Sequence, residues 1–357
     1  MAKDINELLK LMAAVKASDL HLKVPSVPVI RIDGVPVPQE KMAPLSPADL
    51  EDVFQQITTS EQRATFNKQK ELDFAYTVPG LARFRVNALR QRGNMSLAFR
   101  MIPFVIPSIE ELGLPPVSRE LVLKPRGLIL VTGPTGSGKS TTLAALINFL
   151  NDTTLRTVIT IEDPIEFVYE DRKCLIAQRE LGDDTHSFGA ALKHAMRHDP
   201  DVLVIGEMRD LETISTAIMA AETGHLVLAT LHTIDAAQTV DRIIDVFPHD
   251  QQRQIRLQLA QVIQAIMCQT LLPKIGGGRV AAFEVMLATS AIRKLIHDEK
   301  IWEIPANMEL STQEGMQTLE QALARLVKDG LVTLEDAQNK SNNKAKVARF
   351  LQYLNES

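Results

Sequence analysis

A glycine-rich run between an apolar segment and a helical segment constrains this chain more than any other feature. The run covers residues 133–141, reads GPTGSGKST and fits the pattern GxxxxGK[ST]. Glycines in such a run let backbone N–H groups face a phosphate, and the positive end of the following helix points at it. The sequence therefore predicts a nucleoside triphosphate site rather than a simple glycine-rich turn. The contact residues that we expect are Gly133, Pro134, Thr135, Gly136, Ser137, Gly138, Lys139, Ser140 and Thr141.

Short apolar runs alternate with helical segments from Arg126 onward, a pattern typical of a parallel sheet covered by helices. The runs read GLILVTG, RTVITIED, DVLVIGE and HLVLATLH. After Asp235 the pattern is mostly helical, apart from a predicted strand that reads RVAAFEVM. The sequence thus predicts an α/β domain whose first parallel strand leads into the phosphate-binding run.

Acidic residues follow two of the predicted strands, at the edge where parallel sheets bind ligands. Glu207 comes after DVLVIG and is a candidate for Mg²⁺, together with the Ser140 hydroxyl. Glu162, Asp163 and Glu166 come at the end of the other strand. We expect Glu162 to polarise the attacking water, because a catalytic carboxylate must lie within hydrogen-bonding reach of it. The alternative is that these acids only cap the segment that follows.

Two histidines flank the predicted strand LVLATL. His232 follows its carboxyl end, on the side of the phosphates, so we expect it to sense the γ-phosphate through a hydrogen bond. His225 lies at the opposite end and is predicted to order an interface. For both residues the alternative is an ordinary histidine with satisfied hydrogen bonds.

Arginines of the first hundred residues supply cations for phosphate chemistry. Strand alternation places Arg83 and Arg85 on one face, with Phe84 and Val86 on the other. Since the segment shows no acidic neighbours for this pair, we expect a partner, such as nucleotide bound to a neighbouring subunit. A cation supplied in this way can accelerate phosphoryl transfer by roughly 10³ to 10⁵. The alternative is a solvated basic face.

The longest uncharged run, 257–273, invites a membrane interpretation. Gln254, Gln258, Gln261 and Gln264 recur at helical steps, however, which predicts a polar stripe along a helix rather than a membrane span. Charged residues also interrupt the N-terminal apolar positions, so we expect no signal peptide and a cytoplasmic protein.

The composition narrows the class of protein further. The 357 residues carry 39 Lys and Arg against 44 Asp and Glu, a formal net charge of −5, with only 4% aromatic residues. These values disfavour a nucleic-acid motor, which needs basic and aromatic elements for a strand. The two cysteines, Cys174 and Cys268, lie far apart in the sequence, which excludes a metal site built from clustered cysteine pairs.

Taken together, the motifs resemble the type IV pilus retraction ATPases, the PilT family, within the secretion ATPases. The glycine-rich run is similar to the family's Walker A motif, TIEDPIEFV to its Asp box, DPDVLVIGEMRD to its Walker B motif and TGHLVLATLHT to its His box. The resemblance continues through ASDLHL, IRIDG, RFRVN, RIIDVFP, CQTLLPK and GMQTLEQAL. It therefore covers nearly the whole chain.

The resemblance implies an α/β fold of several parts. A small PAS-like α+β domain is expected at 1–102 and a linker at 103–120. A RecA-like P-loop ATPase core is expected at 121–290, followed by a helical C-terminal region at 291–357.

The resemblance also implies roles for single residues. Glu162 matches the catalytic glutamate of the Asp box, Glu207 the magnesium residue of Walker B, and His225 and His232 the two His-box positions. Lys139 belongs to the catalytic set through the Walker A motif. The remaining interface or sensor candidates are Asp163, Glu166, Arg100 and Arg209.

The biological role implied by the resemblance is that of a motor. It is expected to be a homo-hexamer that binds ATP and Mg²⁺ between subunits, with Arg83 and Arg85 reaching across. It would lie in the cytoplasm against the inner membrane, dock on a platform protein there and extract pilin, so that pili retract and cells twitch. A second retraction ATPase is a further expected partner, and nucleic acid is not.

Two departures leave the exact role open between principal and accessory motors. Retracting members typically carry AIRNLIRE, where residues 291–296 here read AIRKLI and His297 follows; Lys294 and His297 replace an amide and an arginine. The segment PANMELSTQEGMQTLEQAL is closer to the accessory, PilU-like ATPases. Pilus-extension and type II secretion ATPases usually add a four-cysteine zinc module, which Cys174 and Cys268 are too few to build, so this alternative is disfavoured. A nucleotide-gated scaffold without turnover is disfavoured as well, since both candidate carboxylates are present.

Overall fold

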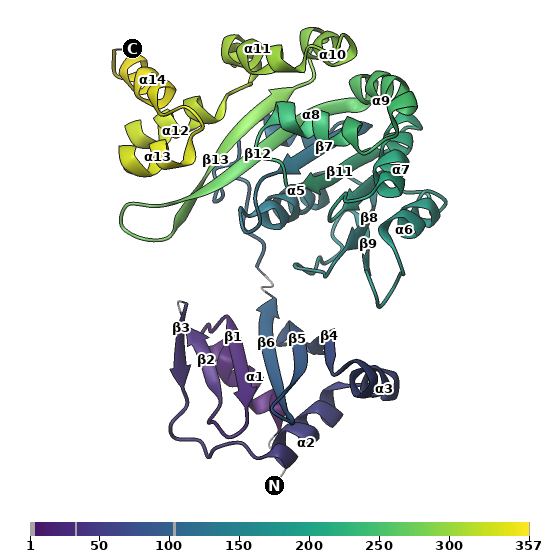
Figure 1. Cartoon of the computed structure of the whole chain (residues 1–357), viewed down its shortest axis with the longest axis vertical. Coiled ribbons are helices and arrows are strands. Elements are labelled where there is room, and N and C mark those ends of the chain that lie inside the picture. The colour runs from purple at the N-terminus through teal and green to yellow at the C-terminus, as the bar shows by residue number, and fades with distance from the viewer. Residues whose placement is uncertain (1–3, 33, 103–104, 357) are drawn as a thin grey trace. The chain divides into compact units, whose positions relative to one another are not determined.

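The computed structural model describes residues 4–32, 34–102 and 105–356, which belong to two compact units, Met1–Val105 and Ile106–Ser357. Residues 103 and 104, at the start of the expected linker, lie outside the described residues. Figure 1 labels the elements of both units.

The first unit combines three helices with an antiparallel sheet along its described residues. The sheet has the strand order β3-β2-β1-β6-β5-β4, and each neighbouring pair is antiparallel. The elements are α1 (Ile5–Ala14), β1 (Asp19–Lys23), β2 (Val29–Ile32), β3 (Val35–Pro38), α2 (Pro47–Ile57), α3 (Ser60–Gln69), β4 (Glu71–Val78), β5 (Ala82–Gln91) and β6 (Asn94–Ile102).

Period-two alternation in β5 determines which side chains enter the core of this unit. Phe84 and Val86 are fully buried, whereas Arg83 is half-buried and Arg85 is exposed. The alternation predicted from the sequence therefore holds in the structure. A reciprocal capping box between Ser46 and Asp49 opens α2.

The second unit is built on a seven-stranded sheet with the order β13-β12-β7-β11-β10-β8-β9. All neighbouring strands are parallel except β12 and β13. The elements up to the last strand are α4 (Val117–Val122), β7 (Gly127–Thr132), α5 (Lys139–Thr153), β8 (Thr157–Glu162), β9 (Leu175–Glu180), α6 (Phe188–Ala195), β10 (Val202–Ile205), α7 (Leu211–Glu222), β11 (Leu226–Leu231), α8 (Ala236–Asp245), α9 (His249–Val262), β12 (Ile263–Pro273) and β13 (Arg279–Leu287).

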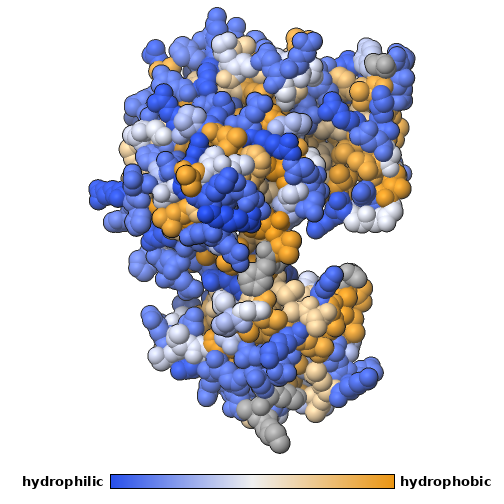
Figure 2. All heavy atoms as spheres, turned by 180° about the vertical axis from the view of Figure 1, so that it is seen from behind, coloured by the Kyte–Doolittle hydropathy of each residue, from blue (hydrophilic) through white to orange (hydrophobic). Residues whose placement is uncertain are grey.

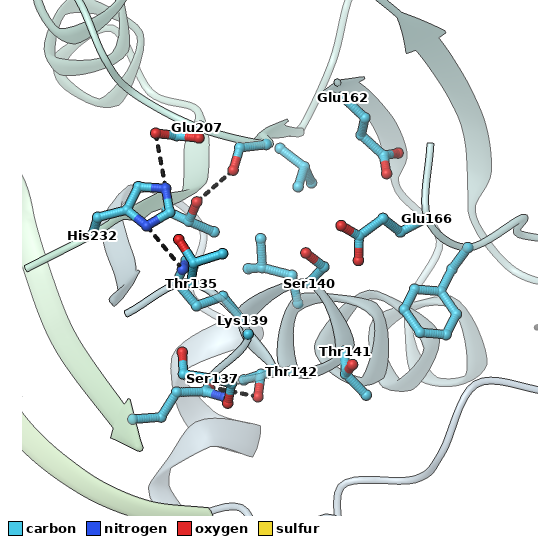
Figure 3. Close-up of a pocket in the computed structure, with 18 of the residues that line it drawn as sticks. Thr135, Ser137, Lys139, Ser140, Thr141, Thr142, Glu162, Glu166, Glu207 and His232 are labelled. Atoms are coloured by element: carbon cyan, nitrogen blue, oxygen red, sulfur yellow. Dashed lines mark hydrogen bonds and ion pairs between the residues drawn. The ribbon is translucent and has the colours of Figure 1, made fainter. Parts of the chain in front are cut away.

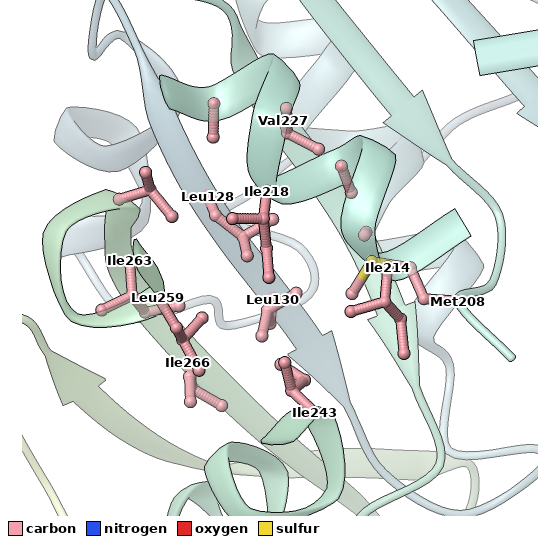
Figure 4. Close-up of a cluster of buried hydrophobic side chains, with 14 of the residues drawn as sticks. Leu128, Leu130, Met208, Ile214, Ile218, Val227, Ile243, Leu259, Ile263 and Ile266 are labelled. Carbon is pink, nitrogen blue, oxygen red and sulfur yellow. The ribbon is translucent and has the colours of Figure 1, made fainter. Parts of the chain in front are cut away.

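Alternating residues of the central strands enter two different cores, one on each face of this sheet. Leu128 and Leu130 of β7 pack with α7, α8 and α9 (Figure 4), whereas Ile129 and Val131 pack with α4 and α5. Because helices cover both faces of the sheet, both alternating sets of side chains in its central strands are apolar. From this uninterrupted apolar pattern the sequence predicted a parallel sheet. The α/β fold class predicted from the sequence is confirmed.

The helix predicted through the glutamine stripe is shorter than expected. Gln254, Gln258 and Gln261 do lie on the more accessible side of α9, but α9 ends at Val262, and Gln264 already belongs to β12. The apolar residues that follow are buried because β12 inserts beside β7 and pairs with β13 on its other side. Over residues 4–32, 34–102 and 105–356, no helix has the length and apolar composition needed to cross a membrane.

Helices dominate the chain after β13, and part of them covers the β12–β13 pair. A separate apolar cluster joins Leu272 and Ala282 of these strands to Leu323 of α12 and Val347 of α14. The elements are α10 (Ser290–His297), η1 (Ile301–Glu303), α11 (Ile304–Leu310), η2 (Thr312–Glu314), α12 (Leu319–Lys328), α13 (Leu334–Lys340) and α14 (Lys344–Glu356).

The segment for which a linker was expected is partly packed. Ile109 and Leu114 are buried in the core around α5, and α4 begins at Val117.

Exposed apolar side chains occur in several parts of the second unit, among them Leu155, Trp302 and Leu310. Figure 2 shows a largely hydrophilic face with apolar patches.

Candidate functional site

The glycine-rich run forms a tight loop between β7 and α5. Gly138 is the residue that precedes α5, and its φ of +92° is a conformation that favours glycine. Gly133 is required for space, because a Cβ atom there would lie 2.3 Å from the carbonyl oxygen of Gln269 and 2.7 Å from the Ser137 hydroxyl. The loop therefore follows the strand–loop–helix path that a phosphate cradle needs.

The Lys139 side chain folds back over this loop. Its Nζ donates to the carbonyl oxygens of Gly133 at 2.9 Å and Pro134 at 3.2 Å, and lies 3.4 Å from Nδ1 of His232. Burial lowers the pKa of Lys139, and the nearby Glu207 and Glu166 carboxylates oppose this shift. The ammonium is thus held at the loop, where the phosphates of a nucleotide would lie.

The side chain of Gln269, on β12, forms hydrogen bonds to the phosphate loop and to α5. The sequence did not predict this contact. The side-chain amide of Gln269 donates to the Ser137 carbonyl oxygen at 2.5 Å, and its Oε1 accepts from the Thr142 hydroxyl at 2.8 Å. The residue is only 3% exposed, so both hydrogen bonds are shielded from water. A glutamine inside an otherwise apolar run was the available signal, because buried amides need partners.

Glu207, just past β10, is held by the side chains of Arg209 and His232. The Nε and Nη2 atoms of Arg209 lie 2.7 Å from its two carboxylate oxygens, and Nε2 of His232 lies 3.0 Å from Oε1. Burial alone would raise the pKa of Glu207, but the hydrogen bonds from Arg209 and His232 outweigh it and lower the pKa. Glu207 is therefore an ionised carboxylate at the edge of the sheet.

His232 connects Lys139 with Glu207 (Figure 3). An ammonium group can only donate, so Nδ1 of His232 accepts from Lys139 and Nε2 carries the proton toward Glu207. The placement predicted for His232, on the phosphate side of the sheet, agrees with this contact.

Glu162 at the end of β8 is held by neutral donors. Its Oε1 accepts from the Thr160 hydroxyl at 2.6 Å and from the Gln178 amide at 3.0 Å. Burial raises the pKa of Glu162 and is only partly offset by these hydrogen bonds. Thr160 could have been inferred from its position two residues earlier on the same face, but Gln178 comes from the adjacent β9 and only the strand pairing reveals it.

These side chains line one cavity of about 800 Å³, together with Asp163 and Glu166. Figure 3 shows the Glu166 carboxylate pointing into it on the side of Ser140. Within the described ranges, no three His, Cys, Asp or Glu side chains gather closely enough to hold a metal ion alone. The hydroxyl and carboxylate oxygens of Ser140 and Glu207 nevertheless suit Mg²⁺, which usually takes few protein ligands and completes its shell with phosphate and water.

His225 lies outside this cavity, as its position before β11 predicts. Its Nδ1 faces the Ala220 carbonyl oxygen at 3.0 Å, and its backbone carbonyl accepts from Gly127 at the start of β7. It therefore lies at the edge of the sheet opposite the phosphate loop.

Arg85 and Arg100 of the first unit have acidic neighbours, which for Arg85 differs from the expectation. Arg85 lies 4.0 Å from Asp73, because β4 pairs with β5 and brings this acid alongside it. Arg100 donates to the buried Asp19 at 2.8 Å. Burial opposes ionisation of Asp19, but hydrogen bonds from Ser18 and Arg100 outweigh it and lower its pKa. Sequence spacing could not show these pairs, since each joins two strands.

Comparisons with known proteins agree on one family. The model of the family described as "Type II/IV secretion system protein" matches residues 1–339. The chain is 48% identical over 338 residues to the "Type IV pilus retractation ATPase PilT" of Pseudomonas aeruginosa, covering 95% of this chain and 98% of that protein. It is 41% identical over 335 residues to the "Type IV pilus ATPase PilU" of the same organism, covering 94% and 87%.

A solved structure, described as the pilus retraction motor PilT with bound ADP, matches with a TM-score of 0.92 and 45% identity. The match covers 97% of this chain and 99% of the solved chain. The resemblance and the ATPase class predicted from the sequence motifs are thereby confirmed. The chain belongs to the type II/IV secretion system protein family and, within it, to the PilT-type retraction ATPases.

Proposed function

We propose that this chain is the Mg²⁺-dependent ATPase motor that powers type IV pilus retraction and twitching motility. The observation that carries the proposal is the chain of contacts from Lys139 through His232 to Glu207, at the end of the phosphate loop. Side chains from the start of α5 and from the ends of β10 and β11 meet there, which is the arrangement that phosphoryl transfer needs. The 48% identity to PilT, against 41% to PilU, favours the principal over the accessory motor.

Each residue of the site has a role in this proposal. Lys139 and the loop N–H groups bind the phosphates, while Ser140 and Glu207 hold Mg²⁺, which would neutralise charge that develops on the phosphoryl oxygens. Glu162 orients the attacking water and accepts its proton. Its raised pKa supports this role, because a general base works best when its pKa lies close to the working pH.

The assembly is proposed to be a homo-hexamer with nucleotide bound between subunits. Arg83 and Arg85 would reach the nucleotide of a neighbouring subunit, with Arg100, Arg209, Asp163, Glu166 and His225 as interface or sensor residues. The ring would act at the cytoplasmic face of the inner membrane, on a platform protein and through it on pilin, with a second retraction ATPase as a further partner. This part of the proposal is supported by the similarity to the two proteins described as PilT and by the sequence motifs.

The test has a biochemical and a cellular part. Purified protein should hydrolyse ATP with Mg²⁺, and Lys139→Ala protein should not. Deletion of the gene should leave excess surface pili and no twitching, and the unaltered gene, but not the Lys139→Ala gene, should restore both. Bald cells would instead indicate a motor for pilus assembly.

A further inference from the structure

Gln178 lies on β9, beside the nucleotide cavity but not among the residues that line it. The strand pairing places Gln178 opposite Thr160 of β8, and Glu162 follows Thr160 two residues later on the same face of the sheet. Gln178 is therefore placed to act on Glu162 from outside the cavity.

The side-chain amide of Gln178 makes three hydrogen bonds. Its Nε2 donates to Oε1 of Glu162 at 3.0 Å and to the Phe167 carbonyl oxygen at 2.8 Å, and its Oε1 accepts from the Tyr169 N–H at 3.0 Å. A primary amide has two N–H groups, so both donors are in use. A flipped amide would turn its oxygen toward two acceptors and its nitrogen toward a donor. The three contacts therefore fix the orientation of this side chain.

Two of these contacts reach the segment between β8 and β9, residues 163–174, which forms neither helix nor strand. Backbone groups of such a segment have no ladder of their own and need partners elsewhere. Side chains of β9 supply them, because Glu180 also accepts from the Ile165 N–H, at 3.4 Å, in addition to the contacts with Phe167 and Tyr169. β9 thus holds this segment at every second residue.

The same segment contributes to the nucleotide cavity. Glu166, Phe167 and Tyr169 all line it together with Glu162. Figure 3 shows Glu162 and Glu166 near one another on one side of the cavity. One glutamine outside the cavity therefore joins the carboxylate at the end of β8 to the segment that carries Glu166.

We propose that Gln178 is a positioning residue that fixes the Glu162 carboxylate against the 165–169 segment. The inference rests on the proposed function, in which Glu162 orients the attacking water, only for its kinetic part. The two N–H groups of one planar amide cannot move independently, so displacement of Glu162 relative to Phe167 breaks one of the hydrogen bonds. A reacting group that is locked in this way keeps the geometry that the reaction needs.

The charges around Glu162 determine what the loss of Gln178 should do. Burial and the Glu166 carboxylate raise the pKa of Glu162, whereas the hydrogen bonds from Thr160 and Gln178 lower it. Without the Gln178 donor the pKa should therefore rise further. The titratable groups around Glu162, on the 163–169 segment, on β9, at the start of α5 and after β10, are Asp163, Glu166, Tyr169, Glu180, Lys139 and Glu207.

The experiment uses the full chain and compares Gln178→Met and Gln178→Glu with the unaltered protein. Methionine has a similar length but makes none of the three hydrogen bonds. Glutamate keeps an acceptor for the Tyr169 N–H but loses both donors and adds a carboxylate beside Glu162. The measurements are kcat and KM for ATP as a function of pH, the affinity for a fluorescent ADP analogue, and amide hydrogen exchange of residues 165–170. Gln254→Met, at an exposed position of α9, is the control.

We expect kcat at neutral pH to fall about tenfold in Gln178→Met and further in Gln178→Glu, with KM and ADP affinity within twofold, because Gln178 does not line the cavity. The acidic limb of the kcat profile should move to higher pH by about one unit in Gln178→Met, since loss of one hydrogen bond to a charged group changes its ionisation about tenfold. Exchange over residues 165–170 should be faster in this variant.

An unaltered pH profile in both variants, or unaltered exchange in Gln178→Met, would overturn the proposal. If Gln178→Met fails to fold, the pH profile of Gln178→Glu decides. Faster exchange in a protein that does not hydrolyse ATP would support the positioning role and reject only the proposed function.

Discussion

The Nε2 atom of His232 lies 3.0 Å from a carboxylate oxygen of Glu207, while the opposite nitrogen of the same ring faces Lys139. This single ring therefore connects the proposed metal ligand with the phosphate-binding lysine. Nucleotide that shifts either partner must change the hydrogen bonds of the histidine. This geometry supports the proposal that His232 senses the nucleotide.

Replacing His232 with alanine should therefore slow turnover more than it weakens binding. We expect kcat to fall by roughly 10- to 100-fold, the order found when a positioned polar group is lost from a charged site, with ADP affinity within a fewfold. Steady-state ATP hydrolysis and titration with a fluorescent ADP analogue measure the two effects. His194→Ala, an exposed histidine on α6, is the control. An equal loss in both variants would contradict a specific role.

The Glu162→Gln substitution should remove turnover and keep nucleotide binding. An amide cannot accept the proton of the attacking water, so we expect kcat to fall at least about 100-fold. The exposed Glu170→Gln variant is the control. In the unaltered protein the raised pKa of Glu162 has a direct consequence: kcat should fall as pH decreases through a value above that of an ordinary glutamate. A pH profile that is flat throughout the acidic range would contradict the assignment.

Replacing Gln269 should destabilise the phosphate loop, although this residue belongs to β12 and not to the loop. The Gln269→Ala substitution leaves the Ser137 carbonyl and Thr142 hydroxyl without their partner, which costs about 1–3 kcal/mol for a buried polar group. We expect a lower melting temperature and a KM for ATP raised about tenfold. Thermal unfolding with and without ADP, together with kinetics, tests this. The exposed Gln261→Ala variant should match the unaltered protein.

The pH dependence of stability tests the surroundings of Glu284, a residue of β13 whose Oε1 accepts a hydrogen bond from the Ala236 N–H at 2.7 Å. Its pKa in the folded protein, about 7, lies above the ordinary value of 4.5, so the folded chain keeps a proton that the unfolded chain has lost between these pH values. The free energy of unfolding should therefore fall as pH rises from about 4.5 to about 7, by at most about 3 kcal/mol. Glu284→Gln cannot titrate, so denaturant unfolding of the two proteins should differ in this slope. Parallel slopes would contradict the shifted pKa.

Mixing two variants tests whether an arginine of one subunit acts on the nucleotide bound to its neighbour. Arg85→Ala protein has an intact phosphate loop and Lys139→Ala protein has intact arginines, so mixed rings should show activity that departs from simple dilution of either variant. Asp73→Ala is the matched control, because it removes the ion pair of Arg85 and leaves the arginine in place. Activity that only follows dilution would argue against sites shared between subunits.

The sequence predicts which side chains meet at the edge of the cavity because one rule governs their position. Glu162, Glu207 and His232 each follow an apolar run, and the carboxyl ends of parallel strands meet at one edge. It fails where contacts join strands that are distant along the chain. Gln269 reaches the loop only because β12 inserts beside β7, and a helical pattern conceals the start of that strand. Gln178 beside Glu162 depends on strand pairing in the same way.

The absence of a side chain at Gly133 has a mechanical meaning. The carbonyl oxygen of Gln269 approaches so closely that not even a methyl group fits between the loop and β12. Loop and strand are therefore in direct contact, and Leu272, three residues further along β12, belongs to the apolar cluster that also contains Leu323 and Val347 of the last helices. Any movement of the loop toward β12 would therefore have to displace that strand, and with it one side of this cluster.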